Sequence, residues 1–366
     1  MAAPIIAQGT GYVLFAYDVA HAFDLAAAER RLAATQRQTV KQKRRAPAFF
    51  EYDPAPLRVT EPAEPLAVGE RVTAPHVEFV LYDFGAVSVS YAIPLRGPLT
   101  GLPGLSTILY GNEQLQADSR RRVQQLVEAL ADAASRSRLA DFVEDYVVFQ
   151  IEAFSEPLEA SMLWTEHAQT VAQVLRAESR PLSQQEVSDA LASRLSFGPN
   201  DATLIDTDVT LLFDPEGEDV RAVIEFANTQ LLEMRFLDQQ LDDTLERAYD
   251  TLARRHGRFA LLGQPGPDLR RLAQLQLDGT ILFEQVTNAL KLVGEQYLAR
   301  VYSLVSRRFH LAEWDASITR KLQTIDGIYA KLTDRAASRR MEVLEWIIIV
   351  LITLELLISL APVLRR

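Results

Sequence analysis

The sequence predicts an α+β protein with three regions: a mixed α/β domain over residues 1–215, a long-helix bundle or coiled coil over 216–338, and a single C-terminal transmembrane helix over 339–366. Three observations support this fold class. Strand and helix signals alternate in the first region. Apolar residues then recur at helical spacing. The most apolar stretch of the chain lies at residues 346–364.

The composition is that of a folded protein and excludes several kinds of site. Of the 366 residues, 48% are hydrophobic and 24% are charged, which is a globular balance. The chain has no cysteine, so disulfides, cysteine-ligated zinc, iron–sulfur clusters and thiol nucleophiles are excluded. A formal net charge of −11 does not favour a global nucleic-acid-binding role, because such proteins present a basic face. We predict no cofactor, no metal site and no catalytic residue.

The first region is predicted to alternate between the two kinds of element. Asp24 is a candidate N-cap for one helix, and Ser183 with Glu186 forms a capping-box pattern at the start of another. The predicted helices cover residues 24–35, 120–134 and 183–195. The predicted strands cover residues 12–17, 77–81, 86–93, 146–154 and 204–213.

A tight turn is predicted between the second and third of these strands. Asp83 and Gly85, with an aromatic residue between them, suit such a turn. The two flanking strands are therefore expected to form a hairpin, with Asp83 serving the turn.

The region after Gly217 has helical periodicity. Its first apolar stripe, with polar Gln230 in one position, consists of Val223, Phe226, Met234, Leu237, Leu241, Leu245, Ala248 and Leu252. Similar stripes follow over residues 272–304 and 311–332. Stripes on long helices pack into a bundle or coiled coil, and packing within one chain or between chains is equally open.

The segment at residues 346–364 has about the 20 residues that cross a hydrocarbon core. Trp346 lies at one end, where interfacial aromatic residues are found. No export signal is visible, so we predict a single-pass anchor in a bacterial inner membrane with the bulk on the cytoplasmic side. Glu355 lies at mid-span, where a carboxylate is costly unless it is protonated or paired. An oligomer contact is favoured there over ion handling or a helix that does not span the membrane.

Three motifs carry a family resemblance. One is Asp83-Phe84-Gly85 with its neighbours, and the second is Glu233-Met-Arg235-Phe-Leu237-Asp238. The third is Leu344-Glu345-Trp346, which continues through an apolar run to Glu355. Together they resemble the required-for-meiotic-nuclear-division family, which includes bacterial YagE-like proteins. The family's helix break corresponds to Phe309-His310-Leu311.

The resemblance implies an α+β domain, long helices and a C-terminal membrane helix. It also implies relatives that act as oligomers at organelle membranes and support mitochondrial translation. It implies no catalytic residues, because none is established for the family.

Two groups of residues support alternative functions. Asp83, Asp238 and Asp242 could serve a metal-dependent hydrolase or an RNA-acting enzyme, although ion pairing is favoured for the two aspartates on one helix. A basic segment could contact anionic lipid or RNA, although a solvated loop is its default interpretation. It contains Lys41, Lys43, Arg44 and Arg45.

The sequence thus predicts a non-enzymatic scaffold or assembly protein that is anchored to a lipid bilayer. Two kinds of further partner are predicted. One is other copies of the chain, and the other is an unidentified protein, RNA or ribosome. The alternative is the metal-dependent enzyme that uses Asp83, Asp238 and Asp242.

Overall fold

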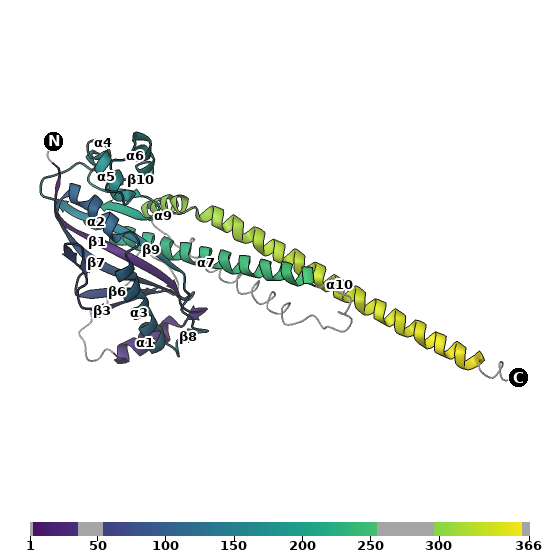
Figure 1. Cartoon of the computed structure of the whole chain (residues 1–366). Helices are drawn as coiled ribbons and strands as arrows, with labels where there is room; N and C mark the ends of the chain where they lie inside the picture. The colour runs from purple at the N-terminus through teal and green to yellow at the C-terminus, as the bar shows by residue number, and fades with distance from the viewer. Residues whose placement is uncertain (1–2, 36–53, 255–295, 361–366) are drawn as a thin grey trace. The chain divides into compact units, whose positions relative to one another are not determined.

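The computed structural model describes residues 3–35, 54–254 and 296–360 (Figure 1). These residues divide into two compact units. The first contains the described residues up to 236 together with 296–315, and the second contains 237–254 and 316–360. The predicted mixed α/β region is confirmed, since a large sheet and several helices build the first unit.

An eight-stranded sheet forms the centre of the first unit, in the order β10-β11-β12-β9-β1-β7-β6-β3. Neighbouring strands are antiparallel except β12 and β9, which are parallel. The strands are β1 (Ile5–Asp18), β3 (Leu57–Pro62), β6 (His76–Leu81), β7 (Ala86–Pro98), β9 (Val143–Phe154), β10 (Arg194–Leu195), β11 (Ala202–Ile205) and β12 (Val209–Phe213). Short strands form two further pairs: β2 (Ala22–Phe23) with β8 (Ala134–Ser135), and β4 (Ala67–Val68) with β5 (Arg71–Val72).

Helices are interleaved with the sheet strands along the chain, and two of them continue into the second unit. α7 and α10 each begin in the first unit and extend into the second. The helices are α1 (Leu25–Thr35), the 3-10 turn η1 (Leu99–Gly101), α2 (Leu102–Leu109), α3 (Glu113–Ala129), α4 (Met162–Thr165), α5 (Ala168–Leu175), α6 (Gln184–Ala190), α7 (Glu218–Arg254), α9 (Gln296–Arg308) and α10 (Leu311–Leu360).

The two faces of the sheet differ in chemistry. Side chains of a strand alternate between faces, yet residues 13–18 of β1 are all buried, so both faces are covered. Phe15, Tyr91 and Phe149 belong to the apolar core that includes residues of α1, α2, α3 and α5. The other face carries small and polar side chains such as Ser88, and residues of α7 contact it. The second face is therefore the one on which charged groups gather.

Helix caps in the first unit follow local sequence signals. The Ala27 amide donates to Asp24 Oδ1 at 2.9 Å, and the Glu186 amide donates to Ser183 Oγ at 3.2 Å, so both predicted N-caps are confirmed. The helix predicted from residue 120 begins earlier, at Glu113, because Asn112 accepts from the Leu115 amide at 3.0 Å.

Two predicted elements are wrong near the edge of the sheet. The helix predicted through residue 195 ends at Ala190, and the chain enters β10. The single strand predicted over 204–213 is a hairpin of β11 and β12. The Asp206 carboxylate accepts from the Thr207 amide at 2.7 Å and stabilises the turn that divides the strand.

The predicted hairpin of β6 and β7 is confirmed, with Tyr82–Gly85 as its turn. Gly85 has a φ of +95°, a conformation that L side chains rarely adopt. Its carbonyl accepts from the amides of Val19 and Ala20, at 3.0 and 3.1 Å. The turn thus binds the chain that leaves β1.

The apolar stripe predicted on α7 is buried from Val223 to Leu241. Gln230, its polar member, accepts a hydrogen bond from the Tyr302 hydroxyl of α9, and the Phe226 ring lies 6.5 Å from the Tyr302 ring. This part of the stripe therefore packs within the chain. The helical periodicity after Gly217 is confirmed as far as the structure describes the region.

The break between α9 and α10 falls at Phe309–His310, where the resemblance predicts a helix break. His310 has a φ of 56°, and its Nδ1 lies 3.3 Å from Oε1 of exposed Glu313. We expect His310→Val to lower the free energy of unfolding by about 1–2 kcal/mol relative to His310→Gly, because β-branched residues resist this conformation. Urea unfolding of both variants measures the difference. Equal stabilities would contradict the expectation, since both variants lose the Glu313 contact.

The predicted transmembrane helix over residues 339–366 is wrong. No helix among the described residues is long and apolar enough to cross a membrane. Glu345 directly precedes the apolar segment, and Glu355 interrupts it. The uncharged residues 346–354 between them rise only about 14 Å along a helix, against roughly 30 Å for a hydrocarbon core. The predictions of a single-pass anchor, a bilayer partner and an inner-membrane location with the bulk on the cytoplasmic side are therefore corrected as well.

Candidate functional site

Three buried carboxyl groups of the first unit form what we call the carboxyl cluster. Asp18 ends β1, Glu144 lies on β9 opposite Ala16, and Glu233 lies on α7. Because Ala16 and Asp18 are two residues apart, Asp18 and Glu144 share one face of the sheet. Only 9%, 7% and 2% of Asp18, Glu144 and Glu233, respectively, is exposed. Charged groups are rarely buried to this extent without partners.

Two arginines accompany the carboxyl cluster. Arg138 Nη2 lies 3.8 Å from Asp18 Oδ2, and Arg235 Nη1 lies 2.5 Å from Glu144 Oε1. Each guanidinium also lies over an aromatic ring, Arg138 over Phe236 and Arg235 over Phe142. Glu233 Oε1 is buried and has no hydrogen-bond partner among the described residues. The two guanidinium groups therefore pair with Asp18 and Glu144, two of the three carboxyl groups.

Burial raises the pKa values of the carboxyl cluster, so its members keep their protons to higher pH. Desolvation raises the pKa of Asp18 to about 7, against the lowering effect of Arg138. Desolvation also raises the pKa of Glu144 to about 7, although Arg235 lowers it. The pKa of Glu233 is raised well above its ordinary value by burial and by the negative charge of Asp18. At neutral pH the cluster is therefore partly protonated.

The carboxyl cluster is not arranged as a metal centre. In the part of the chain that the structure describes, no group of three or more histidine, aspartate or glutamate side chains could hold a metal ion. The arrangement supports the retention and release of protons by carboxyl groups of α7 and of the sheet.

Further charged side chains of α7 face the sheet. Glu225 accepts from Ser88 Oγ at 2.8 Å and from Arg58 Nη2 at 3.2 Å. One turn earlier, Arg221 Nη2 lies 3.6 Å from Glu78 Oε2, and its guanidinium is 4.3 Å from the Tyr12 ring centroid. Arg221 and Glu225 are both almost fully buried. The face of α7 opposite its apolar stripe is thus a buried charged face.

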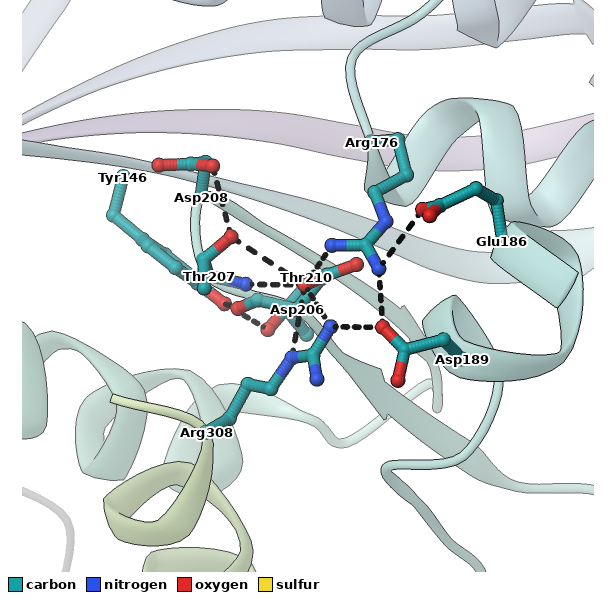
Figure 2. Close-up of polar contacts among 9 residues, drawn as sticks. All are labelled: Tyr146, Arg176, Glu186, Asp189, Asp206, Thr207, Asp208, Thr210 and Arg308. Carbon is teal, nitrogen blue, oxygen red and sulfur yellow. Dashed lines mark hydrogen bonds and ion pairs between the residues drawn. The ribbon is translucent and has the colours of Figure 1, made fainter. Parts of the chain in front are cut away.

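A second charged cluster lies at the β11–β12 turn, and we call it the Asp206 cluster (Figure 2). The Asp206 side chain is fully buried, and its Oδ1 accepts from Arg308 Nη2 at 2.6 Å and Nε at 2.9 Å. Arg176 Nη1 donates to the same oxygen at 3.3 Å. Figure 2 shows both guanidinium groups directed at Asp206 and at Asp189 of α6.

The Asp206 cluster fixes the end of α9 to the sheet. Arg308 is the last residue of α9, and the next residue, Phe309, packs edge-on against Tyr146 of β9 at 5.2 Å. The Tyr146 hydroxyl donates to the Asp206 carbonyl at 2.8 Å. Burial raises the pKa of Asp189, but hydrogen bonds from Arg308 and Arg176 outweigh it and leave this pKa below its ordinary value. Carboxylates surround both guanidinium groups, so the cluster is a structural network rather than an anion site.

The turn residues that the sequence analysis singled out serve the fold. Asp83 is half-buried, and its carbonyl accepts from the Phe23 amide at 2.7 Å. Gly85 lies so close to the chain leaving β1 that a Cβ there would be 1.8 Å from the Ala20 carbonyl oxygen. These contacts explain why this turn needs a glycine.

Asp238 and Asp242 lie in the second unit and bind one lysine. Lys321 Nζ of α10 is 2.8 Å from Asp238 Oδ2 and 2.6 Å from Asp242 Oδ1. Ser317 Oγ also donates to Asp238, at 3.1 Å. The ammonium group occupies the place between the carboxylates that a divalent metal would take. Arg235, three residues before Asp238 on the same helix, pairs with Glu144 of β9.

The remaining candidate residues are of two kinds. Leu344, Glu345 and Trp346 are exposed on α10, and Glu355 lies on the same helix. The basic segment lies outside the described residues; it contains Lys41, Lys43, Arg44 and Arg45.

Sequence reasoning missed most of the buried charged partners. It singled out Glu233 and Arg235 through a motif, but not Asp18, Glu144 or Asp206. A signal was present on α7, where Arg221 and Glu225 recur one turn apart opposite the apolar stripe. Pairing these residues with the right strands required the order of the sheet.

Comparisons with known proteins place the first unit in a family. The family model described as "Uncharacterized protein MJ0711, N-terminal domain" matches residues 8–219, which include the eight-stranded sheet except for the first three residues of β1. The chain is similar to the uncharacterized protein MJ0711 of Methanocaldococcus jannaschii, with 24% identity over 226 residues, or 61% of this chain and 67% of the relative. No solved structure matches the chain. The resemblance to the required-for-meiotic-nuclear-division family stays a prediction. Because the family model covers more than half of the chain, the protein belongs to the family defined by the N-terminal domain of MJ0711.

Proposed function

We propose that the protein is a non-enzymatic assembly protein, and that copies of it associate through the apolar part of α10. The observation that carries this proposal is the exposure of large apolar side chains on that helix. They are Met341, Leu344, Trp346, Ile347, Ile348, Ile349, Val350, Leu351, Ile352 and Leu354.

The exposed residues surround the helix. Every residue from Trp346 to Leu354 is exposed, and Thr353 is the one polar residue among them. Consecutive residues are 100° apart on a helix, so this surface is apolar on all sides. Folded proteins rarely leave such a large apolar patch in water, and a patch of this kind marks an interaction site.

A second copy of the chain is the occupant that fits this surface. Each copy brings the same helix, so the surface is complementary to itself. One partner helix covers only one side of α10, and the apolar surface continues around the others. A bundle of at least three α10 helices therefore covers it better than a pair.

Light scattering coupled to size-exclusion chromatography tests this proposal on the full chain. We expect a particle mass of at least about three times the 41.0 kDa of one chain. Ile348→Lys should shift the mass toward one chain, because a charged residue within an apolar helix contact is strongly unfavourable. The matched control is Gln323→Lys, which adds a lysine at an exposed position of the same helix and should leave the mass unchanged. A wild-type particle of one chain, or an Ile348→Lys variant with wild-type mass, would refute the proposal.

A further inference from the structure

We infer that Asp18 and Glu233 form a proton-dependent latch, in which a proton held by this pair keeps the middle of α7 on the end of β1. Loss of the proton at alkaline pH would loosen this segment of the helix from the sheet. The inference is independent of self-association, because both residues belong to the first unit.

Burial and the unpartnered oxygen of Glu233 favour a proton in this place. Asp18 and Glu233 come from different elements, and both are at least nine-tenths buried. Arg138 pairs with Asp18, and Arg235 pairs with Glu144. Glu233 Oε1 has no hydrogen-bond partner among the residues that the structure describes. An ionised Glu233 would therefore be a buried carboxylate beside a second negative charge, which is strongly unfavourable.

The other charged groups around the pair strengthen this effect. From β9, Glu144 adds a third acidic group, and Asp145 and Asp208 raise its pKa by their charge. The positive groups are Arg138, after β8, and Arg235, on α7 itself. Burial is the largest cause of the raised pKa of both Asp18 and Glu233, which agrees with retention of the proton.

The direction of the pH dependence follows from these raised pKa values. In the unfolded chain both carboxyl groups lose their protons near pH 4. The folded protein keeps a proton until the pH passes the folded pKa, which is about 7 for Asp18. Between these limits, stability falls as the pH rises. The equilibrium constant for folding decreases about tenfold per pH unit for each proton that the folded protein retains. The latch is thus fully closed in mild acid and weakest above neutrality.

Hydrogen–deuterium exchange of the full chain tests the latch directly. Peptides that cover residues 228–238 should lose about tenfold or more in protection between about pH 6 and about pH 8.5, after correction for the intrinsic exchange rate. Glu233→Gln keeps the shape of the side chain but cannot ionise, so its protection should depend less on pH than that of the wild type. Asp18→Asn should reduce the dependence in the same way and serves as a second variant.

The matched control is Glu246→Gln, which neutralises an exposed glutamate of the same helix and should retain the wild-type pH dependence. The latch is wrong if wild-type protection does not change with pH. It is also wrong if Glu233→Gln and Asp18→Asn both keep the wild-type dependence. Neither result bears on the mass of the assembled particle, so this inference and the proposed function fail separately.

Discussion

Gly85→Ala should destabilise the protein by about 3–5 kcal/mol, since the substitution acts at a strained and crowded position. The φ of +95° disfavours any L side chain. A Cβ would also lie 1.8 Å from the Ala20 carbonyl oxygen, a backbone atom that cannot rotate away. The turn would have to move, and the hydrogen bonds from the amides of Val19 and Ala20 to the Gly85 carbonyl would be strained or lost. Each such bond contributes about 1 kcal/mol.

Gly97→Ala is the control that separates the two causes. Gly97 also has a positive φ, of 108°, but among the described residues no atom beyond its chain neighbours lies within 4 Å of a Cβ built there. Its substitution should cost only the backbone strain, about 1–2 kcal/mol. Urea unfolding followed by circular dichroism measures both variants. Equal losses would show that the contact with Ala20 does not constrain the turn.

Asp206→Ala should lower the free energy of unfolding by about 3–5 kcal/mol, because it removes one member of a buried charge network. Arg308 and Arg176 would lose their shared acceptor, and the Thr207 amide would lose the carboxylate that closes the turn. Arg308 would keep only the contact with Asp189, a side chain that is 54% exposed. We therefore expect the end of α9 to lose its fixed position on the sheet.

Asp208→Ala is the matched control for this substitution. Asp208 lies two residues away in the same turn and is exposed, and its carboxylate accepts from Thr207 Oγ1 at 2.9 Å. Its loss should change stability by less than about 0.5 kcal/mol. Denaturant unfolding of the two variants checks the contrast. A loss at Asp206 no larger than that at Asp208 would mean that the buried network contributes no net stability.

Local signals in the sequence predicted the local parts of the fold. Asp24 and Ser183 are helix caps because a short polar side chain can accept from amides of the first turn, whatever the rest of the chain does. The turn at Gly85 was predicted for a similar reason. The stripe from Val223 to Leu241 was predicted because burial of an apolar helix face leaves a periodic trace.

The predictions that failed concern features that depend on residues distant in the sequence. The division of β11 from β12 depends on Asp206, and its two arginines come from segments before and after the turn. The buried charged face of α7 looks solvated in the sequence, because its partners Arg58 and Glu78 are on strands far away along the chain. The candidate site was missed for the same reason, because Glu233 and Asp18 are far apart in the sequence. The transmembrane prediction failed because overall apolarity was given more weight than Glu355, which divides the segment, and Glu345, which precedes it.

The charged face of α7 also determines how the helix can be aligned on the sheet. Arg221 and Glu225 are one turn apart and meet partners of opposite sign, Glu78 and Arg58. A slide of α7 by one turn would bring Glu225 toward Glu78, or Arg221 toward Arg58, and bury two like charges together. An apolar interface would tolerate such a slip at little cost. The ion pairs therefore fix the position of α7 along the sheet. If the two charges of one pair were exchanged, those of the other pair would have to be exchanged as well to keep this effect.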